Sequence, residues 1–174
     1  MATLKSDRIR LSALGTSDVE MLYAWINDRD QALLNAPYRP VHAADHAEWF
    51  ETIRGRNDVV IFGIRLVDGE RLIGSCQLHA IDDRSKSAEL QVRIGEPGAR
   101  GRGYGSEALE LLLGHAFDDL NLRRIALHVF ATNETAIHVY EKLGFQLEGR
   151  LREAAYLDGQ FVDVLVMGLL RDER

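Results

Sequence analysis

The chain has 174 residues and a formal net charge of −6; 46% of its residues are hydrophobic and 28% are charged. This length suits one domain with a substantial core, so we expect residues 1–174 to form a single domain. The acidic balance argues against general nucleic-acid binding, which needs a basic surface, and it is compatible with a cationic substrate.

Three further features predict a cytoplasmic protein that has no membrane partner. No apolar run approaches the roughly 20 residues that a membrane helix needs. Residues 1–8 lack the apolar segment of a signal peptide. The single cysteine, Cys76, cannot form an internal disulfide, which fits a reducing compartment, and we expect its side chain to pack as a small buried group.

The hydrophobic pattern predicts a mixed α/β sheet with helices on both faces. In chain order we expect a strand, two helices, a three-strand meander, a helix, a strand, a helix and two last strands. The strands are expected at 8–14, 59–67, 71–81, 88–94, 123–130, from 145 onward, and at 161–170. The helices are expected at about 19–26, 43–54, 106–120 and 133–143, with caps at 16–18 and at Thr132 or Asn133, and an end at Gly144. Asp68-Gly69 and Asp158-Gly159 are hairpin turns, and residues 27–40 form an irregular connection.

A glycine-rich loop, Arg100-Gly101-Arg102-Gly103-Tyr104-Gly105, separates the strand at 88–94 from the amphipathic helix at 106–120. Glycines tolerate positive φ and let the backbone come close to a ligand. The N–H groups of the loop and the positive end of the following helix would form an anion site suited to a diphosphate, to which the two arginines add charge. Taken alone, a Gly-x-Gly turn before a helix is equally compatible with a plain connection.

Two other phosphate-binding motifs fit this loop poorly. Residues 103–108 match the dinucleotide fingerprint Gly-x-Gly-x-x-Ala, but the preceding strand ends near Ile94, too far from Gly103 for a tight strand-to-glycine turn. Arg123 also stands about 20 residues further on, where that fold needs an acidic residue for the ribose. A Walker A motif does not fit, because the chain has no Gly-Lys-Ser or Gly-Lys-Thr.

Two segments together resemble the GCN5-related N-acetyltransferases (GNAT). Arg100-x-x-Gly103-x-Gly105 resembles the loop with which this family binds the diphosphate of acetyl-CoA, and residues 133–145, Asn-Glu-Thr-Ala-Ile-His-Val-Tyr-Glu-Lys-Leu-Gly-Phe, resemble its second conserved segment. Residues 148–152 and the Asp158-Gly159 hairpin resemble the bacterial branch that contains ribosomal-protein, spermidine and amino-sugar acetyltransferases. The resemblance implies a strongly bent sheet splayed between the fourth and fifth strands, with acetyl-CoA in the gap.

The resemblance also implies which residues contact acetyl-CoA. Gln91, Val92 and Arg93 would offer backbone partners to the pantetheine arm. The diphosphate would be held by Arg100, Gly101, Arg102, Gly103, Tyr104 and Gly105. Asn133 and Ala136 would bind the arm from the opposite side, and Tyr140 would face the thioester sulfur. No metal is implied.

Acetyl transfer to an amine needs a base, a stabilised oxyanion and a protonated leaving thiolate. Glu89, on the fourth strand, is the candidate base; the alternative is a surface or salt-bridged strand residue. Tyr140 would be protonated at neutral pH and could donate to the thiolate; otherwise it is only a packed aromatic. A backbone N–H near Val92 or Arg93 could stabilise the oxyanion if the strand bulges there.

The amine site is expected in the two-helix region near the start of the chain. Its candidate residues are Trp25, Asn27, Tyr38, His46, Trp49 and Phe50. On most helices Trp49 and Phe50 would be core residues. His42 and His46 have the i, i+4 spacing that metals can use, but no third ligand is evident, so no zinc site is expected.

The chain is therefore interpreted as an acetyl-CoA-dependent N-acetyltransferase that acts by direct attack in a ternary complex. The acceptor is expected to be a primary amine on a polyamine, an amino sugar or a protein N-terminus. The alternative is a family member that binds CoA for regulation and does no chemistry. By resemblance alone, the protein could form a homodimer.

Overall fold

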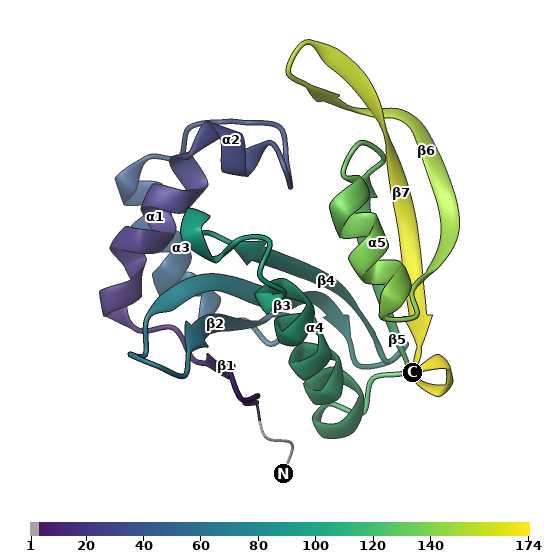
Figure 1. The fold of residues 1–174 in the computed structure, drawn as a ribbon, viewed down its shortest axis with the longest axis horizontal. Coiled ribbons are helices and arrows are strands. Elements are labelled where there is room, and N and C mark those ends of the chain that lie inside the picture. The colour runs from purple at the N-terminus through teal and green to yellow at the C-terminus, as the bar shows by residue number, and fades with distance from the viewer. Residues whose placement is uncertain (1–3) are drawn as a thin grey trace. The chain divides into compact units, whose positions relative to one another are not determined.

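The computed structural model describes residues 4–174, so the first three residues of the segment considered for a signal peptide lie outside the described part. Seven strands in this part form one mixed sheet in the order β1-β2-β3-β4-β5-β7-β6 (Figure 1). The strands are β1 (Ile9–Ser12), β2 (Val60–Leu66), β3 (Leu72–Asp82), β4 (Ser87–Ile94), β5 (Arg124–Phe130), β6 (Gln146–Leu157) and β7 (Gln160–Leu170). The α-helices are α1 (Val19–Asn27), α2 (Arg29–Ala32), α3 (Ala43–Ile53), α4 (Tyr104–Gly114) and α5 (Glu134–Lys142). The predicted α/β class and the predicted order of strands and long helices are confirmed. None of the helices within residues 4–174 combines the length and the apolar character needed to cross a membrane.

The chain divides into two compact units. The first comprises the residues up to Thr16, Asn57–Ile125 and Leu170–Arg174, and so holds β1–β4, α4 and the first residues of β5. The second comprises Ser17–Arg56 and Ala126–Leu169, and holds α1–α3 and α5 with most of β5, β6 and β7. The glycine-rich loop and the fourth strand therefore belong to the first unit, whereas Asn133 and Tyr140 belong to the second.

In the first unit, α4 packs on one face of the antiparallel β1–β4 meander (Figure 1). Leu78 of β3 and Leu90 of β4 are buried on this face. The helix contributes three buried leucines at the spacing that places apolar residues on one side of a helix: Leu109, Leu112 and Leu113. Each fully buried leucine contributes about 1.5–3 kcal/mol of hydrophobic stabilisation, so this contact fixes the position of the helix on the sheet.

The helix α4 begins earlier and ends differently from the helix predicted at 106–120. It starts at Tyr104, inside the glycine-rich loop, because Gly103 adopts a φ of 83° and serves as the N-cap. At its other end the chain widens into a π-turn, in which the Leu120 N–H donates to the His115 carbonyl at 3.0 Å. The loop and the first helical turn are thus one continuous structure.

The strands β4 and β5 begin at the same edge of the sheet. The amides of Arg123 and Arg124 both donate to the carbonyl of Lys86, at 2.6 and 3.1 Å. Because Lys86 directly precedes β4, the two strands run in the same direction, and α4 is the crossover that connects them. This β-α-β unit places the glycine-rich loop at the carboxyl end of β4.

In the second unit, α1 packs against α2 and α3. The segment 27–40, which was expected to be irregular, contains the single turn of α2. The Asp28 carboxylate caps this turn by accepting hydrogen bonds from the N–H groups of Asp30 and Gln31 at 3.1 and 3.3 Å. The Asn27 side chain then exchanges two hydrogen bonds with the backbone of Val41, at 2.9 and 3.1 Å. Side-chain bonds to the backbone therefore hold a segment in which the hydrophobic pattern gave no signal.

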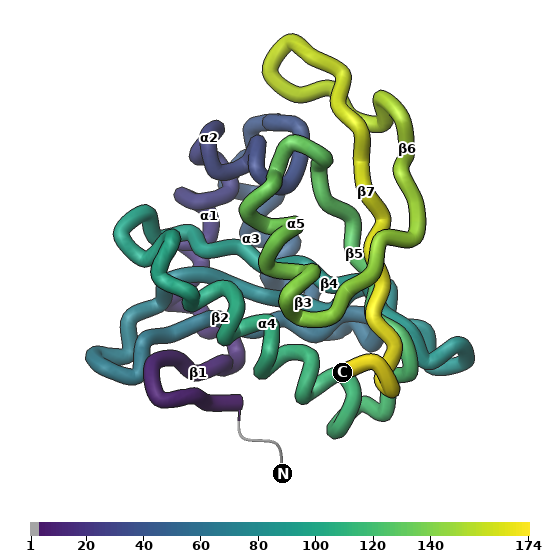
Figure 2. Tube along the Cα trace, turned by 45° about the vertical axis from the view of Figure 1, so that its right-hand side comes forward, coloured from purple at the N-terminus to yellow at the C-terminus, as the bar shows by residue number. Residues whose placement is uncertain are grey.

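The hairpin of β6 and β7 forms the last part of the second unit, and its turn at Asp158-Gly159 is confirmed. In both views the tip of the hairpin extends beyond α5 (Figure 2). Asp163 of β7 holds the larger bulge of β6, since its carboxylate accepts hydrogen bonds from the Glu153 N–H at 2.8 Å and from Arg150 Nε at 2.5 Å. These two hydrogen bonds hold the pKa of Asp163 below its usual range, and the bond from the Glu153 amide has the larger effect.

Candidate active site

The loop predicted to bind a diphosphate contains two left-handed glycine conformations. Gly101 has a φ of 70° and Gly103 a φ of 83°, values that residues with a Cβ rarely adopt. The first hydrogen bond within α4 runs from the Glu107 N–H to the Gly103 carbonyl at 3.1 Å, so the amides of residues 104–106 precede it. Such amides at the positive end of a helix form an anion site. The geometry therefore suits the predicted ligand group.

Arg100 ties this loop to the end of β4. Its Nε donates to the Ile94 carbonyl at 3.1 Å and its Nη2 donates to the Gly95 carbonyl at 3.2 Å. The guanidinium was expected mainly to supply charge to a diphosphate, and the structure adds a second role in closing the loop. Arg102 is exposed, and its side chain makes no hydrogen bond or ion pair with the residues that the structure describes.

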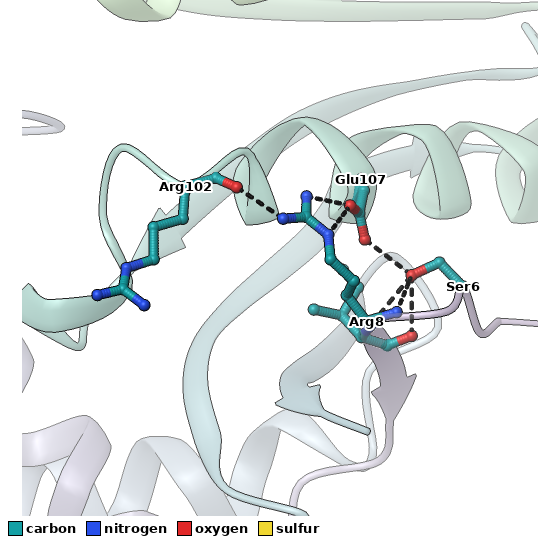
Figure 3. Close-up of polar contacts among 5 residues, drawn as sticks. Ser6, Arg8, Arg102 and Glu107 are labelled. Carbon is teal, nitrogen blue, oxygen red and sulfur yellow. Dashed lines mark hydrogen bonds and ion pairs between the residues drawn. The ribbon is translucent and has the colours of Figure 1, made fainter. Parts of the chain in front are cut away.

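Arg8, which directly precedes β1, clips the same loop from a distant part of the sequence (Figure 3). Its guanidinium forms an ion pair with the Glu107 carboxylate, with Nε 2.5 Å from Oε1, and donates through Nη1 to the Arg102 carbonyl at 3.0 Å. The Ser6 hydroxyl donates to the other oxygen of that carboxylate at 2.8 Å. The guanidinium also lies 4.9 Å from the centre of the Tyr104 ring, as a cation–π contact. Sequence reasoning missed Arg8, because no local pattern connects residue 8 to residues 102–107.

The Arg8–Glu107 pair also sets the charge of the loop. Glu107 lies in the first turn of α4, where a carboxylate interacts favourably with the helix dipole. The same carboxylate, if uncompensated, would repel a diphosphate bound at that end of the helix. Because Arg8 neutralises it, Arg100 and Arg102 leave the loop with a net positive charge.

The predicted pantetheine and oxyanion contacts lie on β4, which is regular over residues 89–94. The bulge that the oxyanion hypothesis required near Val92 or Arg93 is absent from the β3 side, because the register shift between the two strands lies between His79 and Asp82. In a regular strand the N–H groups of adjacent residues point to opposite edges. Either Val92 or Arg93 therefore points its N–H away from β3, even though the strand has no bulge there.

The face of β4 opposite α4 carries three polar side chains: Glu89, Gln91 and Arg93. The candidate base, Glu89, is half-buried and lies opposite His79 in the β3–β4 register. The side chain of Gln91 is used within the sheet, since its Oε1 accepts a hydrogen bond from Gln77 Nε2 at 2.7 Å. Any contact of Gln91 with the pantetheine arm would therefore come from its backbone, as predicted.

Asn133 and Ala136 are joined to each other in the second unit. The Asn133 Oδ1 caps α5 by accepting a hydrogen bond from the Ala136 N–H at 3.2 Å, as its position predicts. Its Nδ2 donates to the Leu34 carbonyl at 3.4 Å. Capping accounts for the asparagine, and its predicted contact with the pantetheine arm would use its remaining lone pair or hydrogen.

Tyr140 is buried on α5, and its ring packs edge-on against Phe145 with the ring centres 5.8 Å apart. Within residues 4–174 its hydroxyl makes no hydrogen bond. Removal from water raises the pKa of Tyr140 to about 12, because burial disfavours the charged phenolate. The hydroxyl is therefore protonated at neutral pH and able to donate, as the predicted role requires.

The candidate acceptor residues all belong to the second unit, but they play different structural parts. Trp25 is buried in the core of this unit, and the amide of Asn27 is occupied by the connection to α3. His46 is buried between the rings of Tyr23 and Trp49, with ring centres 5.5 and 5.2 Å away, and burial lowers its pKa. Phe50 continues this aromatic row at 6.3 Å from Trp49, and Tyr38 is exposed. Trp25 and His46 are therefore core residues, whereas Trp49 and Phe50, for which the core explanation was offered, are half-buried.

Cys76 is buried in the first unit, as predicted, and burial raises the pKa of its thiol, so it is an inert packing residue. His42 is the N-cap residue of α3, and its partner at i+4 is held in the aromatic row. Nowhere in the described part of the chain do three or more histidine, cysteine or acidic side chains gather as they would to hold a metal ion.

Residues 8–146 match the family model of the acetyltransferase (GNAT) domain. Because this match covers most of the chain, the chain belongs to the GNAT family and is an N-acetyltransferase, an enzyme of the acyltransferase class. The family, the fold class and the enzyme class expected from the sequence are thereby confirmed.

Individual relatives agree with this placement. A spermidine N-acetyltransferase from Vibrio cholerae, solved in complex with CoA and spermine, superposes with a TM-score of 0.89 and 29% identity over 97% of this chain and 98% of that chain. The uncharacterized N-acetyltransferase p20 of Bacillus licheniformis is 28% identical over 99% of this chain and 98% of its own length. Spermidine N(1)-acetyltransferase of Vibrio cholerae is 36% identical over 60% of each chain.

Replacing Gly103 by valine is expected to weaken CoA binding by about tenfold, because a β-branched side chain is strained in the left-handed conformation from which α4 begins. An added Cβ would also lie 3.2 Å from Nη2 of Arg8. The measurement is a calorimetric titration with CoA. The matched control is Gly98→Val, since Gly98 has an ordinary φ and its Cβ would meet only Glu96 Oε1 at 3.8 Å. Equal affinities for both variants would contradict the loop assignment.

Replacing Arg8 by glutamine should weaken CoA binding several-fold, because the Glu107 carboxylate is then left uncompensated at the helix end. The double variant Arg8→Gln/Glu107→Gln removes that repulsion and is expected to recover most of the affinity. Titrations of both variants with CoA at low and high salt check this, since screening should shrink the difference. A double variant no better than the single one would show that Arg8 acts only by holding the backbone.

Proposed function

We propose that this enzyme transfers the acetyl group of acetyl-CoA to a primary amine by direct attack in a ternary complex. The observation that carries the proposal is the glycine-rich loop, whose amides at residues 104–106 and uncompensated arginine charge form a diphosphate site at the start of α4. The Vibrio cholerae relative, solved with CoA, supports the choice of cosubstrate. No metal is required by this chemistry.

The attacking amine must first lose a proton. An amine with a pKa near that of lysine, about 10.4, requires roughly 4.6 kcal/mol to become the free base at pH 7. Glu89, directly or through water, is the proposed acceptor of that proton. Acetyl-CoA, when bound, supplies the activated thioester, and the β4 N–H that points away from β3 would stabilise the oxyanion.

Tyr140 is the proposed hydrogen-bond donor to the leaving sulfur. Its pKa of about 12 lies well above that of a thiol, about 8.5, so complete proton transfer to the thiolate would be uphill by roughly 5 kcal/mol. The phenol therefore stabilises the thiolate by donating a hydrogen bond while keeping its proton. The proton that ends on the thiol comes, in net terms, from the amine.

The proposed acceptors are polyamines, amino sugars and protein N-termini. The spermidine N-acetyltransferases among the relatives support the first class. A Bacillus subtilis relative, 27% identical over 96% of this chain, is named a putative ribosomal N-acetyltransferase, which supports the third.

The proposal extends to the domain organisation, the oligomeric state and the location of the protein. We treat residues 1–174 as one acetyltransferase domain, because the family match runs across the residues of both units. Homodimer formation is supported by four exposed apolar side chains on the β6–β7 hairpin and by a dodecameric structure of the Vibrio cholerae enzyme. The four side chains are Leu147, Leu151, Tyr156 and Phe161. The cytoplasmic location stays a prediction.

Release of free thiol from acetyl-CoA tests the proposal. We expect thiol release to rise well above background with at least one of a set of polyamines, amino sugars and peptides with free N-termini, because only a productive amine completes the transfer. Calorimetric titration with CoA runs beside the assay as a control for folding and binding. Tight CoA binding without thiol release from any acceptor would favour the non-catalytic CoA-binding module instead.

Replacing Tyr140 by phenylalanine should lower turnover about tenfold or more while CoA affinity changes little, because the donated hydrogen bond is made only as the thiolate forms. With its pKa raised to about 12, Tyr140 loses its proton only near pH 12, so it should produce no fall in activity between pH 7 and about 10. The matched control is Tyr156→Phe, which removes an exposed hydroxyl. Equal losses in turnover and in CoA affinity would contradict the donor role.

A further inference from the structure

Arg93 is a half-buried cation with no anionic partner among residues 4–174. It lies near the end of β4, and its side chain makes no hydrogen bond or ion pair with any residue from 4 to 174. Burial, with no contribution from a neighbouring charge, lowers its pKa, although the group stays charged at neutral pH. Removing a guanidinium from water without a partner is unfavourable, and an anionic ligand would offset that effect.

The side chain of Arg93 leaves β4 on the face opposite α4. Successive side chains of a strand point to opposite faces, and Ile94 belongs to the α4 face, because its Cγ1 lies 3.7 Å from the position that a Cβ of Gly105 would occupy. Arg93 therefore shares its face with Glu89, the proposed base. The start of α4, where the loop ends, lies on the other face, because Gly105 approaches Ile94 there.

A second donor accompanies Arg93 on that face. Ser75 of β3 pairs with Arg93 in the register, which brings the Cβ atoms of such a pair to about 5 Å. The Ser75 hydroxyl makes no hydrogen bond with any residue that the structure describes. The neighbouring polar pair, Gln77 and Gln91, is already bonded to itself at 2.7 Å. Arg93 and Ser75 together thus present a charged and a neutral donor to one ligand group.

We propose that Arg93 and Ser75 bind an anionic group, a carboxylate or a phosphate, on the amine acceptor. This inference rests on the proposed function, which places the acetyl group beside β4 and the amine at Glu89. The Cα atoms of Glu89 and Arg93 are four residues apart on one strand, about 13 Å. The anion of the acceptor is therefore several bonds away from its amine. A polyamine, which would place a second cation at Arg93, is disfavoured.

Four acceptors with the same six-carbon chain test this preference: aminohexanoate, aminohexyl phosphate, the neutral aminohexanamide and the dication diaminohexane. We expect kcat/KM for the two anionic acceptors to exceed that for the diamine by about tenfold or more, the range of a hydrogen-bonded charge pair. The Arg93→Gln variant should lose this preference, and Ser75→Ala should reduce it. The ratio of kcat/KM for aminohexanoate to kcat/KM for aminohexyl phosphate distinguishes a carboxylate site from a phosphate site.

The matched control is Arg84→Gln, which removes the same charge from the exposed turn between β3 and β4 and should keep the preference. A preference for the diamine in the unaltered enzyme, or an anion preference that survives Arg93→Gln, would overturn the proposal. A rise in KM for acetyl-CoA with Arg93→Gln that is equal for all four acceptors would also overturn it, because the anion would then belong to the cosubstrate.

A binding measurement separates this inference from the proposed function. Aminohexanoate is titrated into the CoA-loaded enzyme and into CoA-loaded Arg93→Gln, and we expect about tenfold weaker binding to the variant. If no amine releases thiol but this difference is present, the proposed chemistry fails while the anion site stands. If thiol is released from amines in general but aminohexanoate binds both proteins equally, the anion site fails and the proposed function stands.

Discussion

The left-handed conformation of Gly103 is the constraint on which the rest of the first unit depends. It lets α4 begin inside the glycine-rich loop, so that unpaired amides and the positive helix end meet directly after β4. A residue with a Cβ would be strained there, and its Cβ would lie 3.2 Å from Nη2 of Arg8. The buried leucines of α4 then hold this start against the β1–β4 meander, which fixes the position of the predicted anion site.

Charge is balanced differently on the two faces of this half of the sheet. On the α4 face, Glu107 is neutralised by Arg8, and Arg100 is satisfied by two backbone carbonyls. On the opposite face, Arg93 has no such partner among the described residues. In the proposed arrangement, the diphosphate binds at the start of α4 and an anionic group of the acceptor binds at Arg93, so each anion has its own positive site.

Burial has opposite consequences for the reactivity of Cys76 and for the proposed role of Tyr140. It raises the pKa of the Cys76 thiol, which removes the thiolate that a nucleophile would need. It also raises the pKa of Tyr140, to about 12, which preserves the proton that a hydrogen-bond donor needs. The same physical effect thus excludes a covalent cysteine intermediate and supports stabilisation of the leaving thiolate by a phenol.

Local signals in the sequence determined the elements, the loop and the family. These signals act between residues close together along the chain, so they could be recognised from the sequence alone. They are the Asp-Gly turns, the glycine at the end of α5, the asparagine cap and the leucine spacing of α4. The role of Tyr140 came from the resemblance of residues 133–145 to the family, and that of Glu89 from the need of the reaction for a base; both roles stay predictions. The short helix α2 was not predicted, because a carboxylate cap holds it and the hydrophobic pattern gives no signal in this segment.

Only the tertiary structure decided the contacts between distant residues. Arg8 reaches Glu107 because α4 packs against β1, and nothing near residue 8 predicts this. The missing bulge on the β3 side of β4, and the pairing of Arg93 with Ser75, are properties of strand register, which depends on both strands at once. Burial, which raises the pKa of Tyr140 and removes part of the Arg93 side chain from water, likewise arises only when separate elements pack together.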